Sequence, residues 1–233
     1  MDLVSRRACR VKQRRVSTKE KILLESRIYF NQQGYGASSL YQISQQLGMS
    51  RGNLTYHFKD KETLMDAHLA QLEMAYDQAL TSSVSIPSWQ SLHAATSKFH
   101  QLQKDYAFIF FDKSVLQLEK TQTLIKKLRD NNIKTQMSMI NLSIQMGNMR
   151  PEIIPGLYHN ISRSYWVLSY FWLLTVTFSD DNDVSWDKIM WSMLLPHFTE
   201  QGVASFKEHF GEAYFGTLGK AYEAYMESSM VGF

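Results

Sequence analysis

The stretch GMSRGNLTYHFKDK, residues 48–61, decides how this chain folds. It reads as a turn followed by a short helix, because Ser50 is placed to cap a helix in which Leu54 and Phe58, four residues apart, form one apolar face. Another short helix ends at Gly48, so the two helices are separated only by a tight turn. A tight, glycine-containing turn between two short helices predicts a helix-turn-helix.

Helical patterns continue on both sides of this motif. A capping box at residues 17–20 predicts a helix over residues 18–33, and Ser38 or Ser39 is placed to cap the short helix that follows. No convincing strand pattern appears, so the sequence predicts an all-α fold. Further helices are expected over residues 61–81, 88–103, 106–120, 121–147 and 157–178, and from residue 186 onward.

The helix that follows Ser50 carries a glycine, Gly52, in its first turn, which costs about 1 kcal/mol relative to alanine. Something other than helix stability therefore favours glycine there. In a helix-turn-helix, the N-terminal part of the second helix enters the major groove of DNA, where arginine reads guanine and asparagine reads adenine. With no side chain, Gly52 lets this turn approach bases or backbone closely. Hydrogen-bonding residues occupy the remaining faces: Arg51, Asn53, Thr55, Tyr56 and His57.

The charge of the chain is unevenly distributed. Residues 1–65 hold 12 Lys and Arg against 5 Asp and Glu, a net charge of +7, whereas the remaining residues hold 13 against 17, a net charge of −4. A basic segment joined to a mildly acidic body indicates a module that binds a polyanion such as DNA. The alternative on charge alone is a solvated basic tail.

Composition favours a cytoplasmic protein. The single cysteine, Cys9, allows no internal disulfide, which favours a reducing compartment, and the N-terminus lacks the apolar run of a secretory signal. The most apolar later stretch, residues 165–178, is too short for the roughly 20 residues of a membrane span. We therefore expect a buried helix there and no membrane association.

No motif for catalysis or metal binding stands out. The seven histidines lack zinc-binding spacing, and residues 216–220 (GTLGK) lack two positions of a phosphate-binding loop. The acidic residues 181–187 lack the glycine and glutamate of a calcium loop, and helix capping explains them better. We expect no enzyme activity, no metal and no cofactor.

The C-terminal part is rich in methionine and aromatic residues. Most of these side chains must form ordinary core, but methionine adapts to varied apolar shapes, and a helical domain can keep a cavity between its helices. This favours an apolar or aromatic ligand of modest size. The candidate pocket residues are Phe99, Phe108, Phe111, Met137, Ile140, Trp166 and Tyr170.

Residues 17–76 resemble the DNA-binding domain of the TetR family. The resemblance is carried by spacing, turn and the ending YHFKDK together, through Gly34, Ser39, Ile43, Gly48, Ser50, Leu54, Tyr56, His57, Phe58 and Lys61. It implies that Arg51, Gly52, Asn53, Thr55 and His57 lie in or beside the groove, and that Ser39, Tyr56 and Lys61 hold phosphates. For Tyr56 and His57 the alternative is packing between the third and fourth helices.

The expected organisation has three parts. Residues 1–16 form a basic arm that either lies along the DNA or is disordered, residues 17–64 form the helix-turn-helix domain, and residues 65–233 form a larger helical domain for ligand binding and dimerisation. The helix expected over residues 61–81 is the only long rigid element that the sequence offers to link the last two. We expect residues 157–178 and the helix from residue 186 to form the dimer interface.

The sequence therefore predicts a one-component transcription regulator. It is expected to bind double-stranded operator DNA as a homodimer and to act as a repressor released by an unidentified small-molecule effector. The alternative is a constitutive DNA-binding or architectural protein whose helical body only dimerises.

Overall fold

The computed structural model describes residues 17–85, 88–178 and 186–218. Within these ranges the chain is helical and forms no β-strand, only one isolated antiparallel bridge between Met149 and Phe198. The predicted all-α class is confirmed. The helices are α1 (Thr18–Gln33), α2 (Leu40–Gln46), α3 (Arg51–His57), α4 (Lys61–Ser85), α5 (Trp89–Asp105), α6 (Ala107–Phe111), α7 (Lys113–Leu116), α8 (Glu119–Gln145), α9 (Leu157–Phe178), α10 (Trp186–Leu194), the 3₁₀ helix η1 (Leu195–His197), α11 (Glu200–Phe210) and α12 (Glu212–Phe215).

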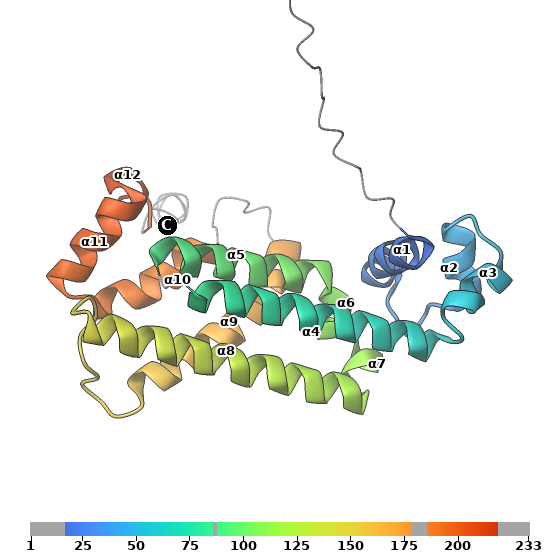
Figure 1. Ribbon diagram of the computed structural model, residues 1–233, viewed down its shortest axis with the longest axis horizontal. Helices are drawn as coiled ribbons and strands as arrows, with labels where there is room; N and C mark the ends of the chain where they lie inside the picture. Colours follow the sequence, from blue (N-terminus) through green and yellow to red (C-terminus); the bar gives the residue numbers. More distant parts are fainter. Residues whose placement is uncertain (1–16, 86–87, 179–185, 219–233) are drawn as a thin grey trace, which may run out of the picture.

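Helices α1–α3 form a small head at one end of an elongated molecule, and α11 and α12 lie at the opposite end (Figure 1). The long helices α4, α5, α8 and α9 make up most of the body between them. The turn between α2 and α3 depends on Gly48, whose φ of +63° is rarely adopted by other residues. The head is thus a helix-turn-helix joined to a helical body.

Three helix boundaries differ from the sequence prediction. Helix α4 continues to Ser85 instead of ending near Thr81. The helix expected over residues 106–120 is broken, because the side chain of Asp112 accepts hydrogen bonds from Ser114 N and Val115 N and so starts a new helix, α7. The segment from residue 186 onward is not one helix, since Pro196 lies in the 3₁₀ turn η1.

Two hydrophobic cores lie along the molecule. The first core joins the head to the near part of the body and includes Ile22, Phe30, Leu54, Phe108 and Leu128. The second core lies farther from the head and is dominated by aromatic residues of the helices after α8, among them Tyr165, Trp186, Trp191, Phe198 and Phe206.

The boundary predicted between residues 64 and 65 lies inside α4, which runs without interruption from head to body. The first core also crosses this boundary. The division into 17–64 and 65–233 therefore stays a prediction. The basic arm, residues 1–16, and the acidic loop at 179–185 lie outside the described residues.

Candidate DNA-binding surface and ligand cavity

Helix α3 is built as the sequence predicts at the local level. The hydroxyl of Ser50 accepts a hydrogen bond from Asn53 N at 3.1 Å and so caps the helix. Leu54 and Phe58 are buried in the first core and pin one face of α3 to the head. Arg51 and Asn53 are not part of this buried face; both are exposed to solvent.

Tyr56 is the most exposed large hydrophobic side chain of the head, with 85% of its surface accessible. Its ring meets only the edge of the His57 ring, at 5.2 Å between centroids, and His57 itself is half-buried. Packing between α3 and α4 therefore does not explain Tyr56. Both the apolar ring and the hydroxyl of Tyr56 are therefore accessible to an external partner.

The hydroxyl hydrogen of Thr55 is engaged within its own helix. The hydroxyl donates to Arg51 O at 3.0 Å and to Gly52 O at 3.1 Å, within the same helix. A base contact by Thr55 would use the methyl group, for example against a thymine methyl.

Nothing inside the protein requires glycine at position 52. Its backbone is helical with no positive φ, and a Cβ built there would approach only Ser50 Oγ, at 4.0 Å. Alanine would fit and would strengthen the helix. The packing of the protein itself therefore does not account for glycine at this position.

Two residues predicted to bind phosphates already have partners within the head. The Ser39 hydroxyl accepts from Gln42 N and the Ser39 backbone N–H donates to Gln42 Oε1 at 2.9 Å, which forms a capping box at the start of α2; the hydroxyl also donates to Gln42 Oε1 at 2.8 Å. The Lys61 ammonium donates to Tyr35 O and Ser38 O, both at 2.7 Å, and lies 4.1 Å from the centre of the Tyr35 ring. Lys61 thus secures the α1–α2 loop and keeps its charge beside the N-terminus of α2.

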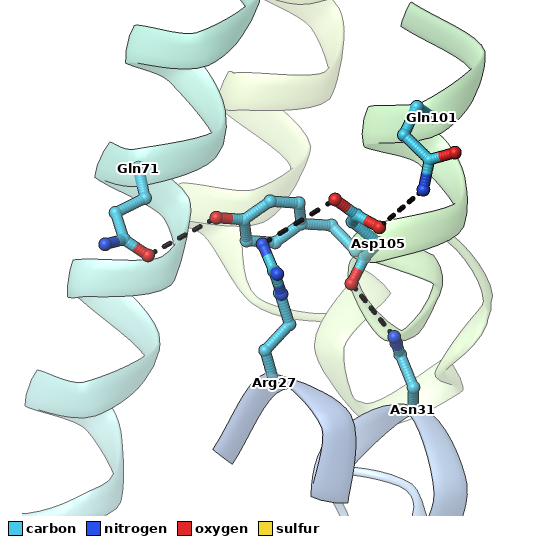
Figure 2. A network of polar contacts seen from close by, with 6 residues as sticks. Arg27, Asn31, Gln71, Gln101 and Asp105 are labelled. Atoms are coloured by element: carbon cyan, nitrogen blue, oxygen red, sulfur yellow. Dashed lines mark hydrogen bonds and ion pairs between the residues drawn. The ribbon is translucent and has the colours of Figure 1, made fainter. Parts of the chain in front are cut away.

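A set of polar contacts connects the head to the body (Figure 2). Arg27 of α1 pairs with Asp105 of α5 at 3.9 Å, and its guanidinium lies over the Tyr106 ring at 4.8 Å. Asn31 donates to Asp105 O at 2.9 Å and accepts from Phe108 N at 3.0 Å. Because Asn31 uses both ends of its amide, it fixes the end of α1 against the start of α6.

Asp112 and His68 make further contacts in this interdomain joint. Asp112 accepts hydrogen bonds from Tyr35 N at 2.7 Å and Gly36 N at 3.4 Å, so the residue that breaks the predicted helix also holds the head. Ser26 Oγ lies 2.9 Å from Nε2 of the buried His68 on α4. We define the joint as Ser26, Arg27, Asn31, His68, Asp105 and Asp112. The sequence predicted α4 as the only long rigid element between head and body; the contacts of the joint are an additional link.

A cavity of about 70 Å³ lies in the second core. Its walls come from α4, α5, α8, α9 and α10 and from the segments that follow α8 and α10. Of the seven pocket residues predicted from sequence, only Phe99 and Ile140 line it. Lining residues that the sequence did not single out include Leu80, Thr96, Asn132, Gln136, Met190 and Trp191.

The other five predicted pocket residues lie elsewhere. Phe108 packs on Phe30 in the first core at 5.2 Å between ring centroids, and Trp166 is buried in the same core. Tyr170 meets the edge of the Phe110 ring at 4.9 Å, and Phe111 lies near it. Met137 lines an open groove between α8 and α9. The prediction that these five residues line the cavity is therefore wrong. Their apolar or aromatic character alone did not distinguish the cavity wall from the core.

Among the residues that the structure describes, no group of three His, Cys, Asp or Glu side chains is arranged to hold a metal ion. No helix in the described ranges is long and apolar enough to cross a membrane.

Comparison with known proteins agrees with a helix-turn-helix regulator. Residues 22–68 match the family described as bacterial regulatory proteins, tetR family. The probable HTH-type transcriptional regulator YttP of Bacillus subtilis is 24% identical over 148 residues, which cover 60% of this chain and 69% of YttP. Residues 22–68 of this chain are therefore similar to the DNA-binding part of TetR-family transcriptional regulators.

Solved structures share the whole fold. A TetR-family transcriptional regulator from Marinobacter aquaeolei VT8 superposes with a TM-score of 0.73 at 18% identity, covering 88% of this chain and 98% of that one. AibR in complex with isovaleryl coenzyme A and operator DNA superposes with a TM-score of 0.57 at 17% identity, covering 77% and 97%.

Proposed function

We propose that this protein is a repressor that binds a palindromic operator as a homodimer and leaves it when a small ligand enters the second-core cavity. The observation that carries the DNA-binding part is the outward face of α3, where glycine is unnecessary for the fold and Tyr56 is left in water. In this proposal Arg51, Gly52, Asn53, Thr55 and His57 meet base edges, and Ser39, Tyr56 and Lys61 meet phosphates.

For Ser39 and Lys61 the structure limits how a phosphate is met. A phosphate must replace the Gln42 amide at the Ser39 hydroxyl, and Lys61 has one N–H donor beyond the two that it uses for backbone carbonyls. Lys61 therefore contributes mainly charge, next to the exposed backbone donors at the N-terminus of α2.

Dimerisation is proposed through α9. Val167, Leu168 and Phe171 form an exposed apolar stripe along one face of this helix, and Phe171 is 59% accessible. A second copy of this chain is the occupant that we propose, because two recognition helices must be held about 34 to 36 Å apart to read both halves of a palindrome. Helix α10 offers less, since its large side chains Trp186 and Trp191 are buried within their own protomer.

Phe171→Glu tests the dimer. The substitution places a charge in the proposed interface, so we expect monomers at micromolar concentration and loss of tight operator binding. Met74→Glu, at an exposed methionine of α4 away from the stripe, is the matched control and should leave the dimer intact. Sedimentation velocity distinguishes the two; a dimer that survives Phe171→Glu contradicts the α9 interface.

Ligand and operator are proposed to communicate through α4. Leu80 near one end of α4 lines the cavity, and Lys61 at the other end holds the loop before α2. A tilt of α4 therefore changes the spacing of the two α3 helices. A factor of 100 in operator affinity requires about 2.7 kcal/mol of ligand preference for the displaced state. AibR, a structural neighbour, was crystallised in complex with isovaleryl coenzyme A and operator DNA, so that protein of similar fold has both a ligand site and a DNA-binding site.

The release mechanism is tested by an operator selected from random DNA with the purified protein. A ligand titration of operator binding, followed by fluorescence anisotropy, should show release. Leu72→Val, buried on α4 between cavity and DNA, should change the ligand concentration for release while sparing operator affinity without ligand; exposed Met74→Val is the control. If no ligand from a broad screen shifts operator binding, the constitutive DNA-binding protein becomes the better reading.

A further inference from the structure

The wall of the second-core cavity lacks charge. Among the described residues that line it there is no Asp, Glu, Lys, Arg or His. An ion that enters such a cavity loses its hydration without gaining a partner of opposite charge, and this penalty is far larger than any apolar gain.

The cavity nevertheless has a polar side. Asn132 is buried, and its Oδ1 accepts a hydrogen bond from Gln136 Nε2 at 2.6 Å, so both amides of α8 are held together at the wall. This pairing leaves the NH₂ group of Asn132 as donor and Oε1 of Gln136 as acceptor. Across from α8, the hydroxyl of the buried Thr96 donates to the sulfur of Met190 at 3.4 Å, a weak acceptor that a ligand oxygen could replace.

The remaining wall is mostly apolar and deformable, although Thr135, Ser143 and Tyr165 also line it. Met139, Met149, Met190 and Met193 contribute to it, and methionine side chains change rotamer at low cost. Because the cavity measures about 70 Å³, a ligand the size of one aromatic ring already requires such movement. The cavity thus fits a small apolar molecule that carries one hydrogen-bonding group.

From these observations we infer that the effector of this protein is an uncharged, mainly apolar molecule carrying a single neutral oxygen function, such as a hydroxyl or carbonyl, that bonds to the Asn132–Gln136 amide pair. The inference rests on the proposed function, because it names the class of molecule that enters the proposed ligand site. It excludes carboxylates, phosphorylated compounds and cationic amines as ligands of this cavity.

The test uses three probes that share one skeleton: benzyl alcohol, benzoate and benzylammonium. Each is titrated at neutral pH into the full-length protein, and binding is followed through tryptophan fluorescence, since Trp89 and Trp191 line the cavity. Benzyl alcohol should bind saturably, and the two ions at least about 100-fold more weakly. Comparable binding of either ion, or no binding of any probe, overturns the inference.

A charge placed in the wall should reverse the preference. Gln136→Glu is nearly isosteric and should improve benzylammonium binding relative to benzyl alcohol by about tenfold or more. Gln145→Glu, exposed on the same helix outside the cavity, is the matched control and should leave all three affinities unchanged. An unchanged preference in a folded Gln136→Glu protein contradicts the assignment of this wall as the polar side.

Operator release is measured separately with the same probes. Binding of benzyl alcohol without release of the operator contradicts the ligand-release function but leaves the ligand class standing. Release by benzoate or benzylammonium, with none by benzyl alcohol, contradicts the ligand class but leaves the function standing.

Discussion

The two cores of this molecule differ in what they hold together. The first core surrounds Phe30, whose ring lies 5.2 Å from both Tyr35 and Phe108, and it joins residues of the head to residues of the body. The second core surrounds Trp191 and Phe206, 5.1 Å apart, and lies entirely within the body. Only the second contains the apolar cavity described above.

This difference between the cores matches the two requirements of the proposed function, a firmly held head and a space for a ligand. Around Phe30, close packing and the joint fix the position of the head, as reading DNA requires. Around Trp191, large rings leave a gap that methionines partly close, which suits the proposed entry of a ligand. The joint makes the first core more than a hydrophobic contact, because polar groups with strict geometry hold α1 to α5 and α6.

The largest effect should come from truncating the centre of each core. Phe30→Ala and Phe206→Ala each remove a fully buried ring, so each should lower the free energy of unfolding by about 3–5 kcal/mol. Only Phe30→Ala should also weaken operator binding in the folded protein, because only Phe30 lies between head and body. Urea unfolding at fixed protomer concentration and operator anisotropy measure the two quantities. If Phe30→Ala and Phe206→Ala lowered operator affinity equally, the first core would have no special role in positioning the head.

Within the head, Arg51→Ala and Lys61→Ala should distinguish recognition of a base from electrostatic attraction to the phosphates. Arg51→Ala should relax preference at one operator position, at a cost of roughly 1 to 3 kcal/mol. Lys61→Ala should weaken binding to all sequences about equally and flatten its salt dependence. It should also destabilise the head, because Tyr35 O and Ser38 O lose their donor. Binding to a set of single-base operator variants checks both; an unchanged ranking for Arg51→Ala would refute its role.

The joint should be sensitive to acid. Burial, with a smaller effect of Arg27, lowers the pKa of His68 from 6.5 to about 3. Between these values the unfolded chain binds a proton that the folded chain does not, so stability falls as pH decreases from 6.5 towards 3. The loss from this group should reach about 2 kcal/mol at about pH 5.

The comparison between cores sharpens this point. Burial and Lys104 lower the pKa of His100, beside the second core, to about 4, but this ring is only partly buried. His68→Asn should flatten the loss of stability below pH 6.5 more than His100→Asn does. Urea unfolding across this pH range tests the order, and the reverse order would show that His68 is not the dominant acid-sensitive group.

The smallest change in stability is expected for Gly52→Ala. Alanine is better in a helix by up to about 1 kcal/mol, and nothing in the protein obstructs its methyl group. The variant should therefore unfold at slightly higher urea while binding the operator more weakly. Gly52→Ala that binds as well as the unaltered protein would mean that no DNA atom approaches this turn closely.

The sequence by itself determined the parts that depend on near neighbours. Ser17 and Ser50 cap their helices as predicted, Ser39 is the one of the two predicted candidates that caps α2, and Leu54 and Phe58 are buried at the expected spacing. These features follow from contacts within one or two helical turns, so a short stretch of residues is sufficient to specify them. The family resemblance rests on the same local signals and is confirmed.

Only the tertiary structure decided which side chains meet across the chain. Phe99 and Phe108 are alike in type and lie close in sequence, yet the first lines the cavity and the second packs on Phe30. Asp112 broke a predicted helix because it caps α7 and holds a loop 77 residues earlier in the chain. The hydrophobic effect is non-directional, so it does not determine which buried residue lines a cavity. Contacts between residues far apart in the chain produce no periodic pattern in the sequence, so the joint could not be predicted from residue spacing.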